Sequence, residues 1–245
     1  MPMKLDIYPT EFEAMSQTRK KKYIAKLVIQ ESKSLPVDAD KKPIAFVMAG
    51  LPGAGKTEFL DTLADLVSKD LRLTPFVRID LDQIVEVYPN YSPKDYYKFR
   101  SQANVVLSYC VDEAIHGRYN VMLDGTFSGE SGATVNTVGR LLDNGYVVRM
   151  VYMYDKPERA WTYSCRRRDD TGRPIEKEGF IKAAENLMRN LNDAVARYSK
   201  RLDFTISAVV QKEIRDREYD IITSKSEVDK ILALTYNIET DSLKG

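Results

Sequence analysis

An eight-residue segment, GLPGAGKT at residues 50–57, limits the fold of this chain more than any other feature. It fits the pattern G-x-x-x-x-G-K-[ST], whose glycines let successive backbone N–H groups point at phosphate oxygens. The apolar run IAFVMAG at 44–50 leads into it, and an amphipathic segment follows over about 57–71. A buried strand, a glycine-rich turn and a helix in this order predict a phosphate-binding loop in an α/β fold.

The side chains of this segment indicate which ligands it binds. Lys56 is long enough to reach the β- and γ-phosphates of a nucleoside triphosphate, and the Thr57 hydroxyl is a ligand for Mg²⁺. The helix that begins here adds its positive end to the site. We therefore expect ATP and Mg²⁺ as cofactors, held by Gly50, Leu51, Pro52, Gly53, Ala54, Gly55, Lys56 and Thr57.

Composition restricts the remaining function classes. The 245 residues include 37 basic and 36 acidic side chains, and this near-neutral charge argues against a nucleic-acid partner. Two cysteines without a CxxC spacing exclude a disulfide framework and a cysteine-rich zinc site. A single histidine argues against a histidine-based metal cluster and a Ser-His-Asp triad. No apolar run reaches the roughly 18–20 residues of a membrane span, and the N-terminus lacks the pattern of a signal peptide. We expect a soluble cytoplasmic protein without a membrane partner.

Short apolar runs alternate with amphipathic segments along most of the chain. This order predicts an α/β fold of the P-loop kinase type, a doubly wound parallel sheet with helices on both faces. The predicted strands are 44–50, 75–80, 120–125, 145–154 and 204–210, and the predicted helices between them are 57–71, 93–117, 131–144, 157–168 and 177–201.

Additional elements are expected at both ends of the chain, outside the segments that form this sheet. We divide the chain into a helical extension and connector at 1–42, a kinase domain at 43–210 and a C-terminal segment at 211–245 that packs on it. The extension contains a predicted helix at 11–34. The C-terminal segment contains a strand at 219–222 and a last helix near 226–235.

Carboxylates follow two of the predicted strands. Asp80 and Asp82 come at the end of the second strand, and Asp124 ends the third. Ligands of parallel sheets bind at this edge, so Asp82 is a candidate general base and Asp124 a candidate ligand of Mg²⁺. For Asp80 we favour a role as a helix cap or as support behind the site. The alternatives are that Asp82 also caps a helix and that Asp124 stabilises its turn.

Four arginines lie within eight residues after the fourth strand. Such a group neutralises charge on a transferring phosphoryl group and closes over it as a lid. We expect Arg173 and Arg168 to act in the transfer and Arg166 and Arg167 to contact the nucleotide, in a polar loop over 165–174. The sequence leaves open which of the first three assists Arg173. The alternative is an exposed helix end, where cations are also favoured.

Signatures of two other nucleotide-binding classes are missing from the sequence. No NKxD segment is present to recognise guanine, and the DGT segment at 124–126 has no catalytic glutamine of the DxxG type. A large motor ATPase is usually longer. A kinase of the nucleotide-kinase type is the class that remains.

Taken together, these motifs resemble the zeta toxin family of bacterial toxin–antitoxin systems over about residues 40–200. The resemblance rests on GLPGAGKT, on IDLDQI followed by YPNY, on DEAIHGRYNVMLDGT, and on the arginines before a helix. It implies a P-loop kinase that phosphorylates the 3′-hydroxyl of UDP-N-acetylglucosamine, and an antitoxin partner that blocks the nucleotide site. It also implies that the UDP-sugar is bound by Asp82, Glu113, Asp124 and Thr126.

The chain departs from the family pattern at three points. Asp124 stands where the best-known members have Glu, the lid arginines are closer together, and residues 128–132 lack a basic side chain. Two alternatives therefore remain beside a UDP-sugar kinase. One is a P-loop kinase of another small hydroxyl compound or a nucleic-acid end. The other is a nucleotide-binding regulatory module that transfers no phosphoryl group.

Overall fold

The computed structural model describes residues 11–12, 14–69, 74–88, 91–213, 218–234, 236 and 243. Several sequence-based expectations fall outside these residues. They are the first ten residues of the extension, the end of the predicted helix 57–71 at residues 70–71, Pro89 and Asn90 of the YPNY segment, and parts of the C-terminal segment, residue 235 included.

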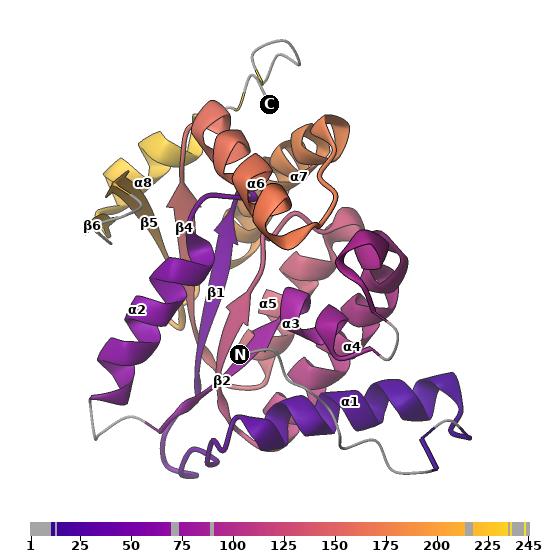
Figure 1. Cartoon of the computed structure of the whole chain (residues 1–245). Coiled ribbons are helices and arrows are strands. Elements are labelled where there is room, and N and C mark those ends of the chain that lie inside the picture. The colour runs from indigo at the N-terminus through magenta and orange to yellow at the C-terminus, as the bar shows by residue number, and fades with distance from the viewer. Residues whose placement is uncertain are drawn as a thin grey trace.

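A six-stranded sheet forms the centre of the molecule (Figure 1), in the order β2-β3-β1-β4-β5-β6. The first five strands are parallel, as predicted, whereas β6 pairs with β5 in the antiparallel direction. Only residues 214–217 separate these two strands, and a parallel crossover needs about a dozen residues or more. The strands are β1 (Ile44–Gly50), β2 (Phe76–Asp80), β3 (Asn120–Asp124), β4 (Val147–Tyr154), β5 (Phe204–Glu213) and β6 (Glu218–Ile222).

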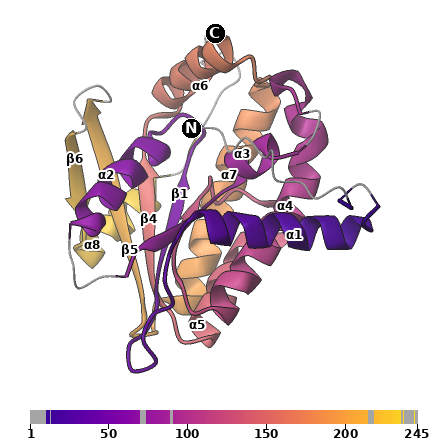
Figure 2. The same cartoon turned by 60° about the horizontal axis from the view of Figure 1, so that its bottom comes forward.

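Helices cover both faces of the sheet. Figures 1 and 2 show α2 on one face and α4, α5 and α7 on the other, while α1 runs across the end of α4. None of the helices described is long and apolar enough to cross a bilayer. The α-helices are α1 (Gln17–Glu31), α2 (Lys56–Ser68), α3 (Leu81–Glu86), α4 (Tyr96–His116), α5 (Ala133–Asp143), α6 (Pro157–Thr171), α7 (Lys177–Tyr198) and α8 (Lys225–Leu232).

Burial on both faces explains why the central strands are continuous apolar runs. All five residues of β3 are buried. One hydrophobic cluster joins the sheet to helices of both faces. It extends from Phe12 and Ile24 at the N-terminal side to Leu232 and Leu243 at the C-terminal side. The segments predicted as additions to the kinase domain therefore share its core.

Three helices differ from the sequence-based expectation, each for a local reason. Helix α1 begins at Gln17 instead of residue 11, because the Ser16 hydroxyl caps it by accepting from the Arg19 N–H at 3.3 Å. Helix α3 is six residues long and was expected only as a segment that Asp80 or Asp82 would cap, and the Asp80 carboxylate does cap it. Helix α6 continues to Thr171, where Gly172 ends it in the left-handed conformation (φ 71°). The first three arginines therefore lie on a helix, and the expectation of a loop from residue 165 was wrong.

The topology brings the motifs to one edge of the sheet. Strand β3 lies between β2 and β1 and is parallel to both, so the carboxyl ends of the three strands lie side by side. Asp80 and Asp124 are register partners in the last positions of β2 and β3. The glycine-rich loop leaves β1 at the same edge, and the Gly50 N–H donates to the Thr126 carbonyl at 3.2 Å.

Candidate active site

The glycine-rich loop connects β1 to α2 and has no room for side chains at two of its glycines. Gly53 and Gly55 both have a φ of 79°, a conformation that L side chains rarely adopt. A Cβ at Gly53 would lie 2.7 Å from the Ser164 hydroxyl of α6, and a Cβ at Gly55 would overlap the Gln211 side chain of β5. The loop is therefore a bare backbone cradle that fits the phosphates of a nucleotide.

Lys56 lies inside this loop. Its side chain is buried, and its Nζ donates to the Leu51 carbonyl at 2.7 Å and to the Gly50 carbonyl at 3.2 Å. Burial lowers the pKa of Lys56 to about 8, although the charge of Asp124 acts in the opposite direction. In this structure the loop's own carbonyls hold the ammonium group that a phosphate would otherwise engage.

Asp124 connects the loop to its neighbouring strands. Its Oδ2 accepts from the Thr57 hydroxyl at 3.3 Å and from the Arg78 guanidinium at 2.6 Å, and its side chain is 5% exposed. Two hard oxygen donors at this separation fit a Mg²⁺ ion, which prefers oxygen ligands. The structure thus brings together the two residues expected to hold the metal, and it adds an arginine that sequence reasoning missed.

Asp80 has a structural role at the end of β2. Its carboxylate accepts from the backbone N–H of Asp82 at 2.8 Å and caps α3, which is a role favoured for it from the sequence. Burial, together with the charges of Asp124 and Asp82, raises the pKa of Asp80 to about 7.

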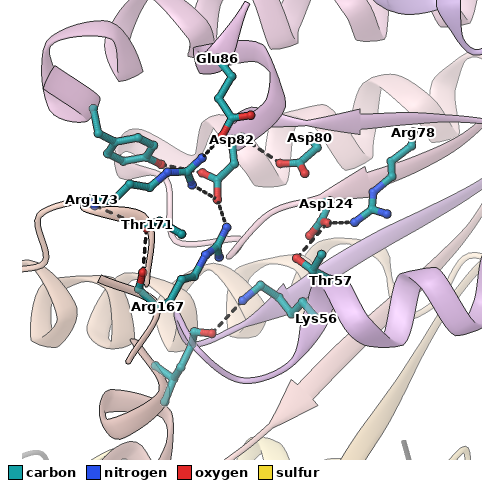
Figure 3. A network of polar contacts seen from close by, with 12 residues as sticks. Lys56, Thr57, Arg78, Asp80, Asp82, Glu86, Asp124, Arg167, Thr171 and Arg173 are labelled. Atoms are coloured by element: carbon teal, nitrogen blue, oxygen red, sulfur yellow. Dashed lines mark hydrogen bonds and ion pairs between the residues drawn. The ribbon is translucent and has the colours of Figure 1, made fainter. Parts of the chain in front are cut away.

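Asp82 lies in the first turn of α3, and the side chains of three other residues contact its carboxylate (Figure 3). Its Oδ1 accepts from the Tyr96 hydroxyl at 2.9 Å. Its Oδ2 contacts Arg167 and Arg173, each at 2.7 Å. Burial acts to raise the pKa of Asp82, but the charges of Arg173 and Arg167 outweigh it and hold this pKa below its usual range.

Arg173 is the most enclosed of the four arginines. Its guanidinium binds Glu86 at 2.6 Å as well as Asp82, and lies over the Tyr96 ring at 5.2 Å from the centroid. The side chain is 14% exposed. Tyr96 and Glu86 were not predicted as site residues. Helix α3 places Glu86 about one turn after Asp82, and predicting that helix would have placed them on one face.

The other two arginines contact residues other than Asp82. Arg166 lies over the Tyr163 ring at 5.4 Å, and Arg168 pairs with Asp169 at 3.0 Å. Successive residues of a helix point about 100° apart, so 166, 167 and 168 cannot share one target. The structure brings Arg167 to Asp82 together with Arg173, and it brings neither Arg166 nor Arg168 there.

The two residues carried over from the resemblance have different positions. Thr126 lies beside the loop, where its carbonyl accepts from Gly50 and its hydroxyl contacts Ser128 at 2.5 Å. Glu113 is near the far end of α4, roughly 25 Å of helix rise from Tyr96, next to the start of β3. The structure does not bring Glu113 to this site.

The sheet order, the glycine cradle and the carboxylates beside it define a P-loop kinase-like α/β protein. The chain belongs to the zeta toxin family, whose sequence model matches residues 28–224. No curated protein sequence matches the chain significantly.

Solved structures share this fold at low sequence identity. One from the PezAT chromosomal toxin–antitoxin system of Streptococcus pneumoniae is 19% identical with a TM-score of 0.62, and covers 96% of this chain and 90% of that one. The AvrRxo1-ORF1:AvrRxo1-ORF2 complex with ATP is 12% identical with a TM-score of 0.56, and covers 91% and 72%. The native form of that complex is 15% identical with a TM-score of 0.56, and covers 89% and 73%.

Proposed function

We propose that this chain transfers the γ-phosphoryl group of ATP to a hydroxyl group of a small acceptor, with Asp82 as the general base. The observation that carries this proposal is the position of Asp82 between Arg167 and Arg173 at the edge of the sheet where the phosphate loop begins. The charges of Asp82 and Arg167 both act on the pKa of Lys56, so this group lies within electrostatic reach of the loop.

The loop would bind the triphosphate through its backbone N–H groups. Lys56 would leave the Gly50 and Leu51 carbonyls for phosphate oxygens, and Thr57 and Asp124 would hold Mg²⁺. When bound, Mg²⁺ neutralises charge on the β- and γ-phosphate oxygens.

Asp82 is shielded in this structure, because Tyr96 and the two arginines engage both of its oxygens. A carboxylate with a lowered pKa is a weak base. We infer that Arg167 and Arg173 move to phosphoryl oxygens when ATP binds, which frees Oδ2 and raises the proton affinity of Asp82. Oδ2 then accepts the proton of the acceptor hydroxyl, while the Tyr96 hydroxyl keeps the carboxylate oriented through Oδ1.

The acceptor that we propose is the 3′-hydroxyl of UDP-N-acetylglucosamine, on the strength of the family alone. Thr126, next to the loop, is the proposed contact for this sugar nucleotide. Glu113 has no part in the proposal, because it lies far from the site that contains Asp82. We also propose a role as a toxin with an antitoxin partner that covers the nucleotide site. One structural neighbour comes from a toxin–antitoxin system and another is a two-protein complex, which supports this proposal.

The test is ATP turnover with Mg²⁺, with and without UDP-N-acetylglucosamine, with products resolved by mass spectrometry. Lys56→Ala and Asp82→Asn are compared with the wild type, and Asp193→Asn on the surface of α7 is the matched control. We expect a phosphorylated UDP-sugar from the wild type and the control, and at least about a 10²-fold loss in the other two variants.

Other outcomes would redirect the proposal. Intact sugar with slow, Lys56-dependent ATP hydrolysis would keep the nucleotide site and replace the acceptor. The next acceptors would be other small hydroxyl compounds and nucleic-acid ends. Tight ATP binding without any turnover would favour a regulatory nucleotide-binding module.

A further inference from the structure

Arg78 occupies an unusual place beside the phosphate loop. Its guanidinium bridges two carboxylates, Asp61 of α2 at 2.5 Å and Asp124 at 2.6 Å. The Asp124 oxygen that it contacts is the one that also accepts from the Thr57 hydroxyl. Figure 3 shows the side chains of Arg78, Asp124 and Thr57 converging. The guanidinium charge of Arg78 therefore lies next to the two oxygens, of Asp124 and Thr57, that fit a Mg²⁺ ion.

The electrostatics of the strand ends explain why a cation is needed there. Asp80, Asp82 and Asp124 end or follow two adjacent strands, and Asp124 is almost fully buried. A buried carboxylate without a partner strongly destabilises a fold. Arg167 and Arg173 neutralise Asp82, which leaves Arg78 as the partner of Asp124.

The second carboxylate contact distinguishes Arg78 from a simple ion-pair partner. Asp61 is 45% exposed, so it does not need Arg78 to compensate for burial. It gives the guanidinium a second anchor. If a metal ion takes over the Asp124 oxygen, Arg78 still has an ion pair and its position on β2.

We propose that Arg78 is a built-in cation that competes with Mg²⁺ for Asp124 and so sets how strongly nucleotide binding depends on Mg²⁺. Without metal, Arg78 keeps Asp124 neutralised and the loop ready for a nucleotide. With Mg²⁺, the Asp124 oxygen passes from the guanidinium to the metal, and Asp61 retains Arg78. Arg78 is thus a positioning residue. The inference rests on the proposed function only in assigning Mg²⁺ to Thr57 and Asp124.

The test measures ADP affinity by titration calorimetry, once in EDTA and once in saturating Mg²⁺. The quantity compared is the ratio of Kd in EDTA to Kd in Mg²⁺. In Arg78→Gln the competitor is gone and Mg²⁺-free binding loses a positive charge, so we expect this ratio to rise about tenfold or more. In Asp61→Asn the guanidinium has only Asp124 left, so we expect the ratio to fall below the wild-type value.

The control is Arg149→Gln, which removes an arginine of β4 that hydrogen-bonds Thr205 at 2.9 Å and should leave the ratio unchanged. An Arg78→Gln protein that binds ADP with the wild-type ratio overturns the inference. So does an Asp61→Asn protein whose ratio is unchanged or higher, which decides the matter if Arg78→Gln does not fold. A wild type that binds no ADP under either condition contradicts the proposed function instead.

Discussion

Asp80 has the least favourable environment for a charge among the carboxylates of this site. Burial and two neighbouring aspartates raise its folded-state pKa to about 7, well above the value near 3.8 of the unfolded chain. Folding therefore takes up a proton, and the stability that Asp80 contributes is complete at low pH and is lost as the pH rises through 7.

Asp80→Asn should remove this pH dependence. Asn keeps the cap on α3 and cannot ionise. We expect the variant to be more stable than the wild type at pH 8, by about 2 kcal/mol, and to lose this advantage near pH 4. Urea unfolding at four values between pH 4 and 8 measures both curves. Curves that stay parallel over this range would show that Asp80 is ionised in the folded protein throughout.

Gln211 is a buried polar side chain that the proposed chemistry does not use. It is 1% exposed, and neither its amide oxygen nor its amide nitrogen has a hydrogen-bond partner among the residues that the structure describes. It packs against Gly55 behind the phosphate loop. An unpaired buried amide destabilises the folded state by about 1–3 kcal/mol.

Gln211→Met keeps the volume and removes the unpaired amide. We expect it to raise the free energy of unfolding by about 1 kcal/mol, measured by urea denaturation. Gln83→Met on the exposed side of α3 is the control and should change this free energy by less than about 0.5 kcal/mol. A loss of stability in Gln211→Met would mean that the amide has a buried partner such as a water molecule.

At the scale of elements, helix α6 decides which arginines reach the site. It runs without a break to Thr171, whose hydroxyl donates to the Arg167 carbonyl at 2.7 Å. This regular geometry directs Arg167 to Asp82 and turns its two neighbours away.

Four single substitutions test this division of the arginines. Arg167→Gln and Arg173→Gln should each lower kcat for phosphoryl transfer by about 10²-fold or more, because each removes a positive charge that is proposed to bind the transferring phosphoryl group. Arg166→Gln and Arg168→Gln should stay within about threefold of the wild type. Steady-state kinetics with ATP and the acceptor measure all four. An equal loss in Arg168→Gln would mean that α6 rearranges when substrate binds.

The sequence predicted the loop and both acidic strand ends because those signals are local. GLPGAGKT and the apolar runs before Asp80 and Asp124 lie within one or two elements. The contact between Arg78 and Asp61 depends on strand order and on which face α2 covers, and no spacing within one element encodes these. The contact between Arg167 and Asp82 joins α6 to α3, which lie far apart in the sequence, so no local pattern encodes it. The antiparallel β6 follows from a short connection that could have been noticed.

At the scale of the whole molecule, the segments at both ends share one core with the sheet. Ile24 of α1 is fully buried in the same hydrophobic cluster as the central strands. Tyr236 stacks on Tyr154, with ring planes 6° apart, and its hydroxyl contacts the Tyr152 hydroxyl at 2.6 Å. Residues outside 43–210 therefore pack directly on the sheet and on α4.

This packing predicts one cooperative unfolding transition. Ile24→Ala leaves a cavity worth about 2–5 kcal/mol, and Tyr236→Ala removes a ring stack and a hydrogen bond. If the ends belong to the cooperative unit, both variants should lower the single Tm by roughly 5–15 °C and keep one calorimetric peak. Leu202→Ala, at a fully exposed side chain, should not shift it. A separate low-temperature peak in either variant would mean that its end unfolds independently, and would favour the division at 42/43 or 210/211 that the sequence suggested.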